Sequence, residues 1–230
     1  MVVEPSLTIQ PVDFEHLLVL IGTVSGTPWS WSWPEGTPSD QLPEFDITGV
    51  TSEGETITIP DVKFGSCRIT ASRGNPIEVT FDGVSIGEIT YATAALSNTP
   101  PSTARLMYLD ACAAVGSGGG TIDSITIELS KELEPRRSVE CSGGRYATEI
   151  IEKMKSVRFD ATIEVTDKYP WTEHKDVDTA KTVSLTVGDA VLTITGCLYD
   201  DLSFEEVPDG EVKTVSLTGT GLGFTAVENV

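Results

Sequence analysis

The sequence has few of the residues from which enzyme active sites and metal centres are usually built. Its 230 residues include two histidines and four cysteines, and no two cysteines form a CxxC pair. The GxSxG, Walker A and HExxH motifs are absent as well. We therefore expect no catalytic site, no metal site and no cofactor. Cys67, Cys112, Cys141 and Cys197 are interpreted as small buried thiols.

Basic residues are also scarce, since 15 lysines and arginines stand against 35 acidic residues and give a formal charge of −20. Nucleic acids and anionic membranes are polyanions, so this charge excludes stable binding to either. The longest apolar run near the start, 17–21, is far shorter than the roughly 20 residues that span a bilayer. The first sixteen residues lack the basic and apolar regions of a signal peptide. We expect synthesis in a cytoplasm and no membrane partner.

Strict alternation of apolar and polar residues is the dominant pattern that is present. In 121–130, Ile125, Ile127 and Leu129 fall on one face, and hydroxyl or acidic residues fall on the other. The same pattern recurs, with turn residues between several of the runs, at 56–59, 67–72, 77–81, 156–166, 181–187, 190–195 and 213–218. Many short strands without alternating helices predict a mainly β protein, an antiparallel β-sandwich or barrel.

Three segments depart from this alternation. Good helix formers, with Ser102 or Thr103 as N-cap and Gly116 as a stop, predict one flanking helix at about 103–115. The stretch 147–156 is compatible with a short helix or a turn. Residues 1–45 contain many prolines and no sustained alternation, which predicts an N-terminal arm rich in proline and tryptophan, followed by a β domain over 46–230.

The arm contains a stripe of tryptophans in the stretch TPWSWSWPEG. Trp29, Trp31 and Trp33 occupy alternate positions, so on an extended chain their side chains point the same way. We expect them to pack as a staple between subunits or between rings of subunits. Stacking platforms for a sugar and packing within the same subunit are the alternatives.

The polar faces of the predicted strands carry mostly serine and threonine. Charged side chains normally protect sheet edges from pairing with other sheets, and here they are scarce. A sheet needs no such protection when its edges already join the sheets of identical neighbours in a closed ring. The intrinsic preference of threonine for strands is the plainer reason for the same composition.

Two further features have weaker chemical interpretations. Asp200, Asp201, Glu205 and Glu206 form an acidic cluster that could hold calcium or cleave a glycoside, but solvated charge around a hairpin is the better interpretation in so acidic a chain. The glycine-rich stretch 219–223 ends a predicted strand and opens no helix, so it is a flexible strand end and not a phosphate-binding loop.

Two stretches resemble a known family. Residues 122–167, with a strand ending near Leu-Glu-Pro, a short Ala-Thr-Glu-Ile-Ile connection and a second long strand, resemble the core of major tail tube proteins of tailed viruses of bacteria and archaea. Residues 191–222 look like the terminal hairpin of that family, in which the last strand follows an Asp-Gly turn. The likeness covers about half the chain, and the arm departs from the compact core expected of the family.

The resemblance implies a structural, non-enzymatic subunit of a siphovirus-like tail. Such subunits assemble into six-membered rings whose inner sheets merge into one continuous β-barrel, and the rings stack into a tube for genome delivery. The implied partners are copies of the chain itself, a tape-measure protein, a tail terminator, baseplate or tip proteins, and viral DNA in transit without stable binding. The implied location is the virion tail, assembled in the host cytoplasm.

A conduit for DNA should offer its cargo few basic contacts, because each one adds salt-dependent affinity for phosphate. We therefore expect the alternating polar faces of 121–130 and 181–195 to line the channel. The channel-lining candidates are Ser124, Thr126, Glu128, Ser130, Thr182, Ser184, Thr186, Thr193 and Thr195.

The composition is also compatible with two different classes of protein. A carbohydrate-binding or surface-adhesion β-sandwich would use a tryptophan stripe, and an enzyme on a β scaffold would use a convergent set of catalytic groups. The excess of acidic residues is, in addition, how proteins stay hydrated in concentrated salt, where the Debye length falls to about 3 Å and long-range repulsion vanishes. A halophilic archaeal virus and a bacterial phage both fit this sequence.

Overall fold

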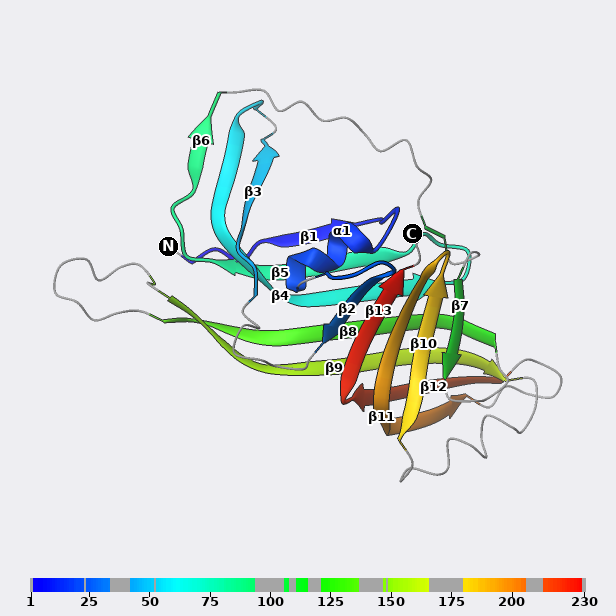
Figure 1. Ribbon diagram of the computed structural model, residues 1–230. Helices are drawn as coiled ribbons and strands as arrows, with labels where there is room; N and C mark the ends of the chain where they lie inside the picture. The colour runs from blue at the N-terminus through cyan, green and yellow to red at the C-terminus, as the bar shows by residue number, and fades with distance from the viewer. Residues whose placement is uncertain are drawn as a thin grey trace.

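The computed structural model describes residues 2–22, 24–33, 42–51, 53–93, 106–107, 111–115, 121–136, 147, 149–165, 180–205 and 213–228. Antiparallel strands make up nearly all of this part of the chain (Figure 1). They form one continuous network of 13 strands, which is folded into two main sheets and one small three-stranded sheet. The predicted mainly β, antiparallel fold is confirmed.

The larger sheet, called the long sheet here, contains the longest strands. Its order is β1–β5–β4–β8–β9–β12, followed by the second half of β11. The bounds are β1 Ser6–Ile9, β4 Thr56–Ser72, β5 Glu78–Ser85, β8 Thr121–Arg136, β9 Glu149–Val165, β11 Ala190–Glu205 and β12 Lys213–Gly221. Beyond the body of the protein, β8 and β9 continue as a projecting two-stranded ribbon (Figure 1).

The smaller sheet, called the short sheet here, lies across the long sheet (Figure 1). Its order is β7–β10–β11–β13–β2, and it uses only the first half of β11. The bounds are β2 Trp29–Trp33, β7 Ala111–Val115, β10 Lys181–Val187 and β13 Gly223–Glu228.

Strand β11 connects the two sheets because it changes partners along its length. Up to Cys197 it pairs with β10 and β13, and from Leu198 it pairs with β12. Gly196, at this change, has a φ of 63°, a left-handed conformation that glycine adopts without strain. The kink at Gly196 folds the two sheets onto each other.

The inward side chains of both sheets form one hydrophobic core. Ile127 and Phe159 of the long sheet and Leu185 and Leu192 of the short sheet belong to the same buried cluster, and each is at most 1% exposed. Alternation along the strands sends every second side chain into this cluster, as the sequence predicts. The sheet path stays open, since among the described strands β1 pairs only with β5 and β7 only with β10.

A small sheet projects from the body at the bend of β4. Asp61 has a φ of 52°, and the part of β4 before it pairs with β3 (Phe45–Val50) and β6 (Thr90–Ala92) instead of the core strands. Figure 1 shows this three-stranded sheet standing away from the long sheet. Its base is joined to the core by Phe45, Ile47 and Ile59.

The structure corrects two predictions of local structure. The prediction of a helix at about 103–115 is wrong for 111–115, because these residues form β7 and pair with β10. Residues 102–105 and 108–110 lie outside the described part of the chain. The stretch 147–156, taken as a helix or turn, enters β9 at Glu149 and pairs with β8. Pairing with a neighbouring strand outweighs helix propensity in both places.

The N-terminal segment does not behave as a separate arm. Strand β1 pairs with β5, and β2 pairs with β13. Between them lie the only described helical turns, α1 (Glu15–Leu18) and η1 (Val19–Ile21), which bury Phe14, Leu18 and Ile21 in the core. The partners that the sequence led us to expect on another surface are found on the same chain.

Candidate functional site

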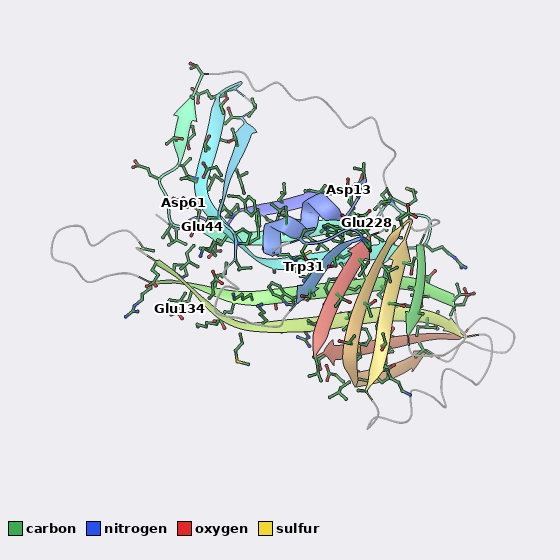
Figure 2. The ribbon with its side chains drawn as sticks, viewed as in Figure 1. Asp13, Trp31, Glu44, Asp61, Glu134 and Glu228 are labelled. Atoms are coloured by element: carbon green, nitrogen blue, oxygen red, sulfur yellow. The ribbon has the colours of Figure 1, made fainter. Side chains whose placement is uncertain are left out.

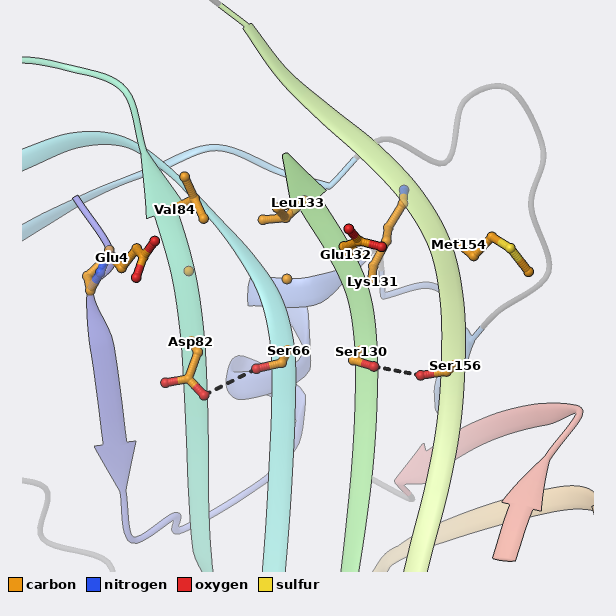
Figure 3. Close-up of a pocket in the computed structure, with 13 residues that line it drawn as sticks. Glu4, Ser66, Asp82, Val84, Ser130, Lys131, Glu132, Leu133, Met154 and Ser156 are labelled. Carbon is orange, nitrogen blue, oxygen red and sulfur yellow. Dashed lines mark hydrogen bonds between the residues drawn. The ribbon is translucent and has the colours of Figure 1, made fainter. Parts of the chain in front are cut away.

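The outward face of the long sheet is a grid of small hydroxyl side chains. Cross-strand register aligns Ser66, Ser130 and Ser156 in one row. The Oγ atoms of Ser130 and Ser156 lie 2.6 Å apart, and Ser66 donates a hydrogen bond of 3.3 Å to Asp82 (Figure 3). The following rows contain Thr70, Ser72, Ser124, Thr126, Thr162, Ser216, Thr218 and Thr220. Hydroxyls both donate and accept hydrogen bonds, so this face can hold water across its width.

Charged side chains of both signs are spread thinly over the same face. Glu128 lies between Arg68 and Arg158 in one row that crosses β4, β8 and β9. One guanidinium nitrogen of Arg68 is 3.6 Å from Oε1 of Glu128, and both side chains are more than a third exposed. Carboxylates in neighbouring rows come from Glu78, Asp82, Asp160, Glu164 and Asp201. The face is therefore acidic overall, and Arg68 and Arg158 stand in the same row.

The outward face of the short sheet is different, because its described central rows carry no charge. One row crosses all five strands as Ser32, Thr225, Thr193, Ser184 and Ala114. The next row consists of Ser30, Val227, Val191 and Thr186. Such a face can be covered by another protein surface without desolvating a charged group.

These two hydroxyl faces point in opposite directions, since the inward faces of both sheets share one core. The channel-lining candidates are therefore divided between them. Ser124, Thr126, Glu128 and Ser130 lie on the long sheet. Thr182, Ser184, Thr186, Thr193 and Thr195 lie on the short sheet. A bore on one side of the subunit can meet only one of these two sets.

A trough of about 690 Å³ crosses the outward face of the long sheet where the β8–β9 ribbon leaves the body (Figure 3). Register shifts between Phe64 and Ser66, and between Lys131 and Leu133, mark β-bulges at this position, and bulges increase the bend of a sheet. Side chains of Glu4, Asp82 and Glu132 contribute carboxylates to the lining. The described residues contain no group of His, Cys, Asp and Glu side chains that could hold a metal ion.

The tryptophan stripe is buried in its own subunit. Trp29, Trp31 and Trp33 lie on one face of β2, as their spacing predicts, but they are only 2%, 3% and 3% exposed. The ring of Trp31 stacks on that of Trp33 at 5.8 Å and meets the ring of Phe224 edge-on at 5.6 Å. A side chain at Gly22 would overlap the indole of Trp31.

These contacts correct the expected inter-subunit staple. Pairing of β2 with β13 turns the indoles into the core and leaves Ser30 and Ser32 outside. Figure 2 shows Trp31 in the interior between the sheets. The stripe packs within the same subunit, and its buried faces offer a sugar no stacking surface.

A buried ion-pair cluster joins three strands of the long sheet. Glu152 of β9 accepts a hydrogen bond of 3.0 Å from Lys63 of β4 and contacts Lys131 of β8 through its other oxygen. Their side chains are only 8–11% exposed. The backbone N–H of Leu42 also donates to both carboxylate oxygens, at 3.1 and 3.2 Å. The cluster thereby fixes the chain that leads into β3.

The electrostatics of this cluster favour its charged form. Burial opposes the charge of Glu152, but hydrogen bonds from Lys131 and Lys63 lower its pKa below the ordinary 4.5. Sequence analysis did not identify the cluster, although a signal was present. Lys131 stands at an inward position of the alternation, between Leu129 and Leu133.

The remaining predicted features have plainer roles. Asp200 and Asp201 are exposed beside an irregularity of β11, while Glu206 lies outside the described residues. The glycine-rich stretch 219–223 is not the flexible strand end that we expected. Gly219 to Gly221 complete β12 and pair with β9, and after Leu222 the chain enters β13 at Gly223. Cys67 and Cys197 are buried free thiols as predicted, and burial raises the pKa of Cys197 to about 11.

Two hydroxyl-rich faces over one shared core, with unpaired margins at β1 and β7 among the described strands, are compatible with a β subunit that assembles with other proteins. The chain belongs to the phage tail tube protein family, whose model matches residues 5–226. This match runs from before β1 into β13, so the family resemblance seen in the sequence is confirmed. A comparison with curated proteins gives no match. In the described chain, no helix has the length and apolar character needed to cross a membrane.

The protein is therefore a structural subunit of a viral tail tube and a component of the virion tail. Members of this family serve as structural proteins. The division of charge between its two outward faces is the feature from which a more specific function can be argued.

Proposed function

We propose that the subunit assembles into stacked rings of six, and that the outward face of the long sheet lines their channel. The observation that carries this proposal is the charge difference between the two faces. The long sheet presents hydroxyls with scattered carboxylates, whereas the described central rows of the short sheet are uncharged. The first face is suited to a channel wall that stays in contact with water, and the second face is suited to a contact with another protein.

Strand length supports the same orientation. Strand β9 has 17 residues and, at about 3.3 Å per residue, reaches about 55 Å, whereas β10 has 7 residues and reaches about 23 Å. The long sheet can thus supply a tall wall within one ring. Among the described strands, β1 and the second half of β11 each have one unpaired side, which leaves backbone groups with which the sheets of neighbouring subunits can pair.

DNA would traverse this channel without being held. Phosphates contribute affinity mainly through lysine and arginine contacts. In the four outward rows that cross β4 from Ser66 to Ser72, the only basic residues described are Arg68 and Arg158. Beyond these rows, Arg73 is paired with Glu164, and Lys153 is paired with Glu132 and Glu134. During assembly in the host cytoplasm the same bore would enclose a tape-measure protein. A terminator and tip proteins would close the two ends of a siphovirus-like tail.

The large negative charge suggests a further property of the source. A chain with 35 acidic residues and only 15 basic ones keeps a strongly hydrated surface in concentrated salt. Rings that form only near molar potassium chloride would favour a virus of a halophilic archaeal host. Rings that form at low ionic strength would favour a bacterial phage.

Electron microscopy of the purified protein tests the proposed function. We expect hollow tubes or annuli in negative stain, because the open sheet margins need partners. Thr126→Lys, which adds a positive charge to the long sheet, should leave tubes intact but make them retain DNA. A protein that stays a single particle at high concentration, in low and in high salt, would contradict the proposal.

A further inference from the structure

One row of the long sheet contains the arginines Arg68 and Arg158 together with Glu128. In order across the strands it consists of Thr80, Arg68, Glu128, Arg158 and Thr220. Arg68 and Arg158 are exposed to solvent. Arg73, just beyond the end of β4, is paired with Glu164 at 3.2 Å and lies outside this row. If the face lines a channel, this row is the place where passing phosphates would be held.

Glu128 is positioned to counter both arginines. It forms the ion pair with Arg68, and it stands directly opposite Arg158 on the neighbouring strand. Side chains directly opposite each other on one face of an antiparallel pair have Cβ atoms only about 5 Å apart, so the carboxylate lies within reach of both guanidinium groups. Asp160, two residues along β9 from Arg158, adds a second negative charge on that side.

We propose that Glu128 is a charge mask, which keeps Arg68 and Arg158 from binding the phosphates of DNA in transit. This inference rests on the proposed function, in which the long sheet faces the channel. A ring of six would repeat both arginines six times at one height. Each phosphate contact steepens the dependence of log K, where K is the DNA-binding constant, on log salt by about 0.9. An unmasked row would therefore form a circle of phosphate-binding sites in every ring.

The proposed masking depends on where Glu128 lies, not on how much Glu128 contributes to the free energy of unfolding. An ion pair between exposed side chains contributes little to the free energy of unfolding, so removing it should leave the fold intact. Substitution by glutamine keeps the shape of the side chain and one acceptor oxygen while removing its charge. Glu128→Gln therefore isolates the electrostatic effect.

The chain offers a matched control on the same strand. Glu134 also lies on β8 and also forms an ion pair, with Lys153 at 2.7 Å, but it belongs to the projecting ribbon (Figure 2). Lys153 keeps a second partner in Glu132 at 2.8 Å. Glu134→Gln thus makes the same change in net charge outside the arginine row.

The experiment measures binding of a short fluorescent DNA duplex to the full chain, both as assembled tubes and as dispersed subunits. At about 50 mM salt we expect Glu128→Gln to bind the duplex at least about tenfold more tightly than wild type, and to lose this affinity near 200 mM. Glu134→Gln should match wild type. The triple variant Arg68→Gln/Arg158→Gln/Glu128→Gln should lose most of the gained affinity.

Each outcome decides the proposal. Equal binding by wild type and Glu128→Gln, or equal gains in Glu128→Gln and Glu134→Gln, would overturn the mask. Failure of wild type to form tubes would overturn the proposed function, but binding by the dispersed subunits would still decide whether Glu128 masks the arginines. Thermal unfolding of each variant verifies that its fold is retained.

Discussion

The two outward faces of this subunit are both rich in serine and threonine, but they differ in the number of charged side chains. On the long sheet, the rows of serine and threonine also contain Arg68, Arg158 and several carboxylates, among them Glu128. On the short sheet, the described side chains of the central rows are serine, threonine, alanine and valine. Strand faces rich in hydroxyl side chains can therefore serve different purposes. The number of charged side chains indicates whether such a face is suited to contact with water or to contact with another protein.

The common core explains how two such faces can coexist in a small subunit. The inward residues of both sheets meet in one cluster, so neither outward face has to contribute to folding. Each face is therefore free to be specialised for a different contact. The following predictions test this division.

The largest effect is expected from placing a charge on the short sheet. Thr193→Lys puts an ammonium group at the centre of the uncharged rows, where covering it would require its desolvation. We expect this variant to fold but to form no tubes. Thr126→Lys, at the matching position of the long sheet, should still form them, and electron micrographs of both variants make the comparison.

If both variants assembled equally well, the short sheet would not be an assembly contact. Unfolding experiments provide the control, since surface substitutions of this kind normally change the free energy of unfolding by less than about 0.5 kcal/mol. A folded Thr193→Lys monomer separates an assembly defect from a folding defect.

The next effect concerns the inner side of the short sheet. Trp31→Ala removes a ring that is 3% exposed and packs on Trp33 and Phe224. We expect the free energy of unfolding to fall by about 3–5 kcal/mol, because the indole leaves a cavity under β2. Denaturant unfolding measures this, and a loss below about 1 kcal/mol would show that β2 contributes little to the core.

A somewhat smaller loss is expected in the long sheet from Glu152→Gln. This substitution leaves the nearly buried Lys63 and Lys131 without their shared carboxylate. Removing one partner of such a cluster costs about 3 kcal/mol in the free energy of unfolding. The same denaturant titration measures it, with Glu134→Gln on the exposed ribbon as the control that should change little.

Acid should diminish the contribution of Glu152. Its pKa in the folded state lies below the ordinary 4.5, so its ionised form stabilises the fold above pH 4.5. This stabilisation is lost as the pH falls below 4.5 and through the lowered pKa. The difference in unfolding free energy between wild type and Glu152→Gln should therefore shrink in acid, whereas a constant difference would assign the effect to packing.

The smallest effect is expected within the hydroxyl grid itself. Ser130→Ala removes the contact of 2.6 Å with Ser156 on the outward face of the long sheet. A single hydrogen bond contributes about 0.5–1.5 kcal/mol, and a solvated one lies at the lower end. Thermal unfolding should show a minor shift with normal tube formation, and loss of tubes would show that this row makes contacts between subunits.

Much of the fold could be predicted from alternation along the strands. The pattern in 121–130 correctly assigned Ile125, Ile127 and Leu129 to the core and their neighbours to the surface. The alternate spacing of Trp29, Trp31 and Trp33 correctly indicated an extended strand. These features depend on the geometry of a single strand, which can be predicted from the spacing of apolar residues along the sequence.

The parts that could not be predicted depend on pairing between distant strands. Alanine-rich 111–115 has the composition of a helix, but its partner β10 makes it a strand. The side to which the tryptophans turn is set by register with β13, and the rows of the candidate wall are set by register among β4, β8, β9 and β12. No single stretch of sequence contains that information.

Electron cryomicroscopy of assembled tubes is the most direct test of the central claim. We predict a hollow tube whose inner surface is the outward face of the long sheet, with Thr126, Glu128 and Ser130 facing the bore and Thr193 covered by protein. A tube whose bore is lined by Thr193 and Ser184 of the short sheet would contradict this account.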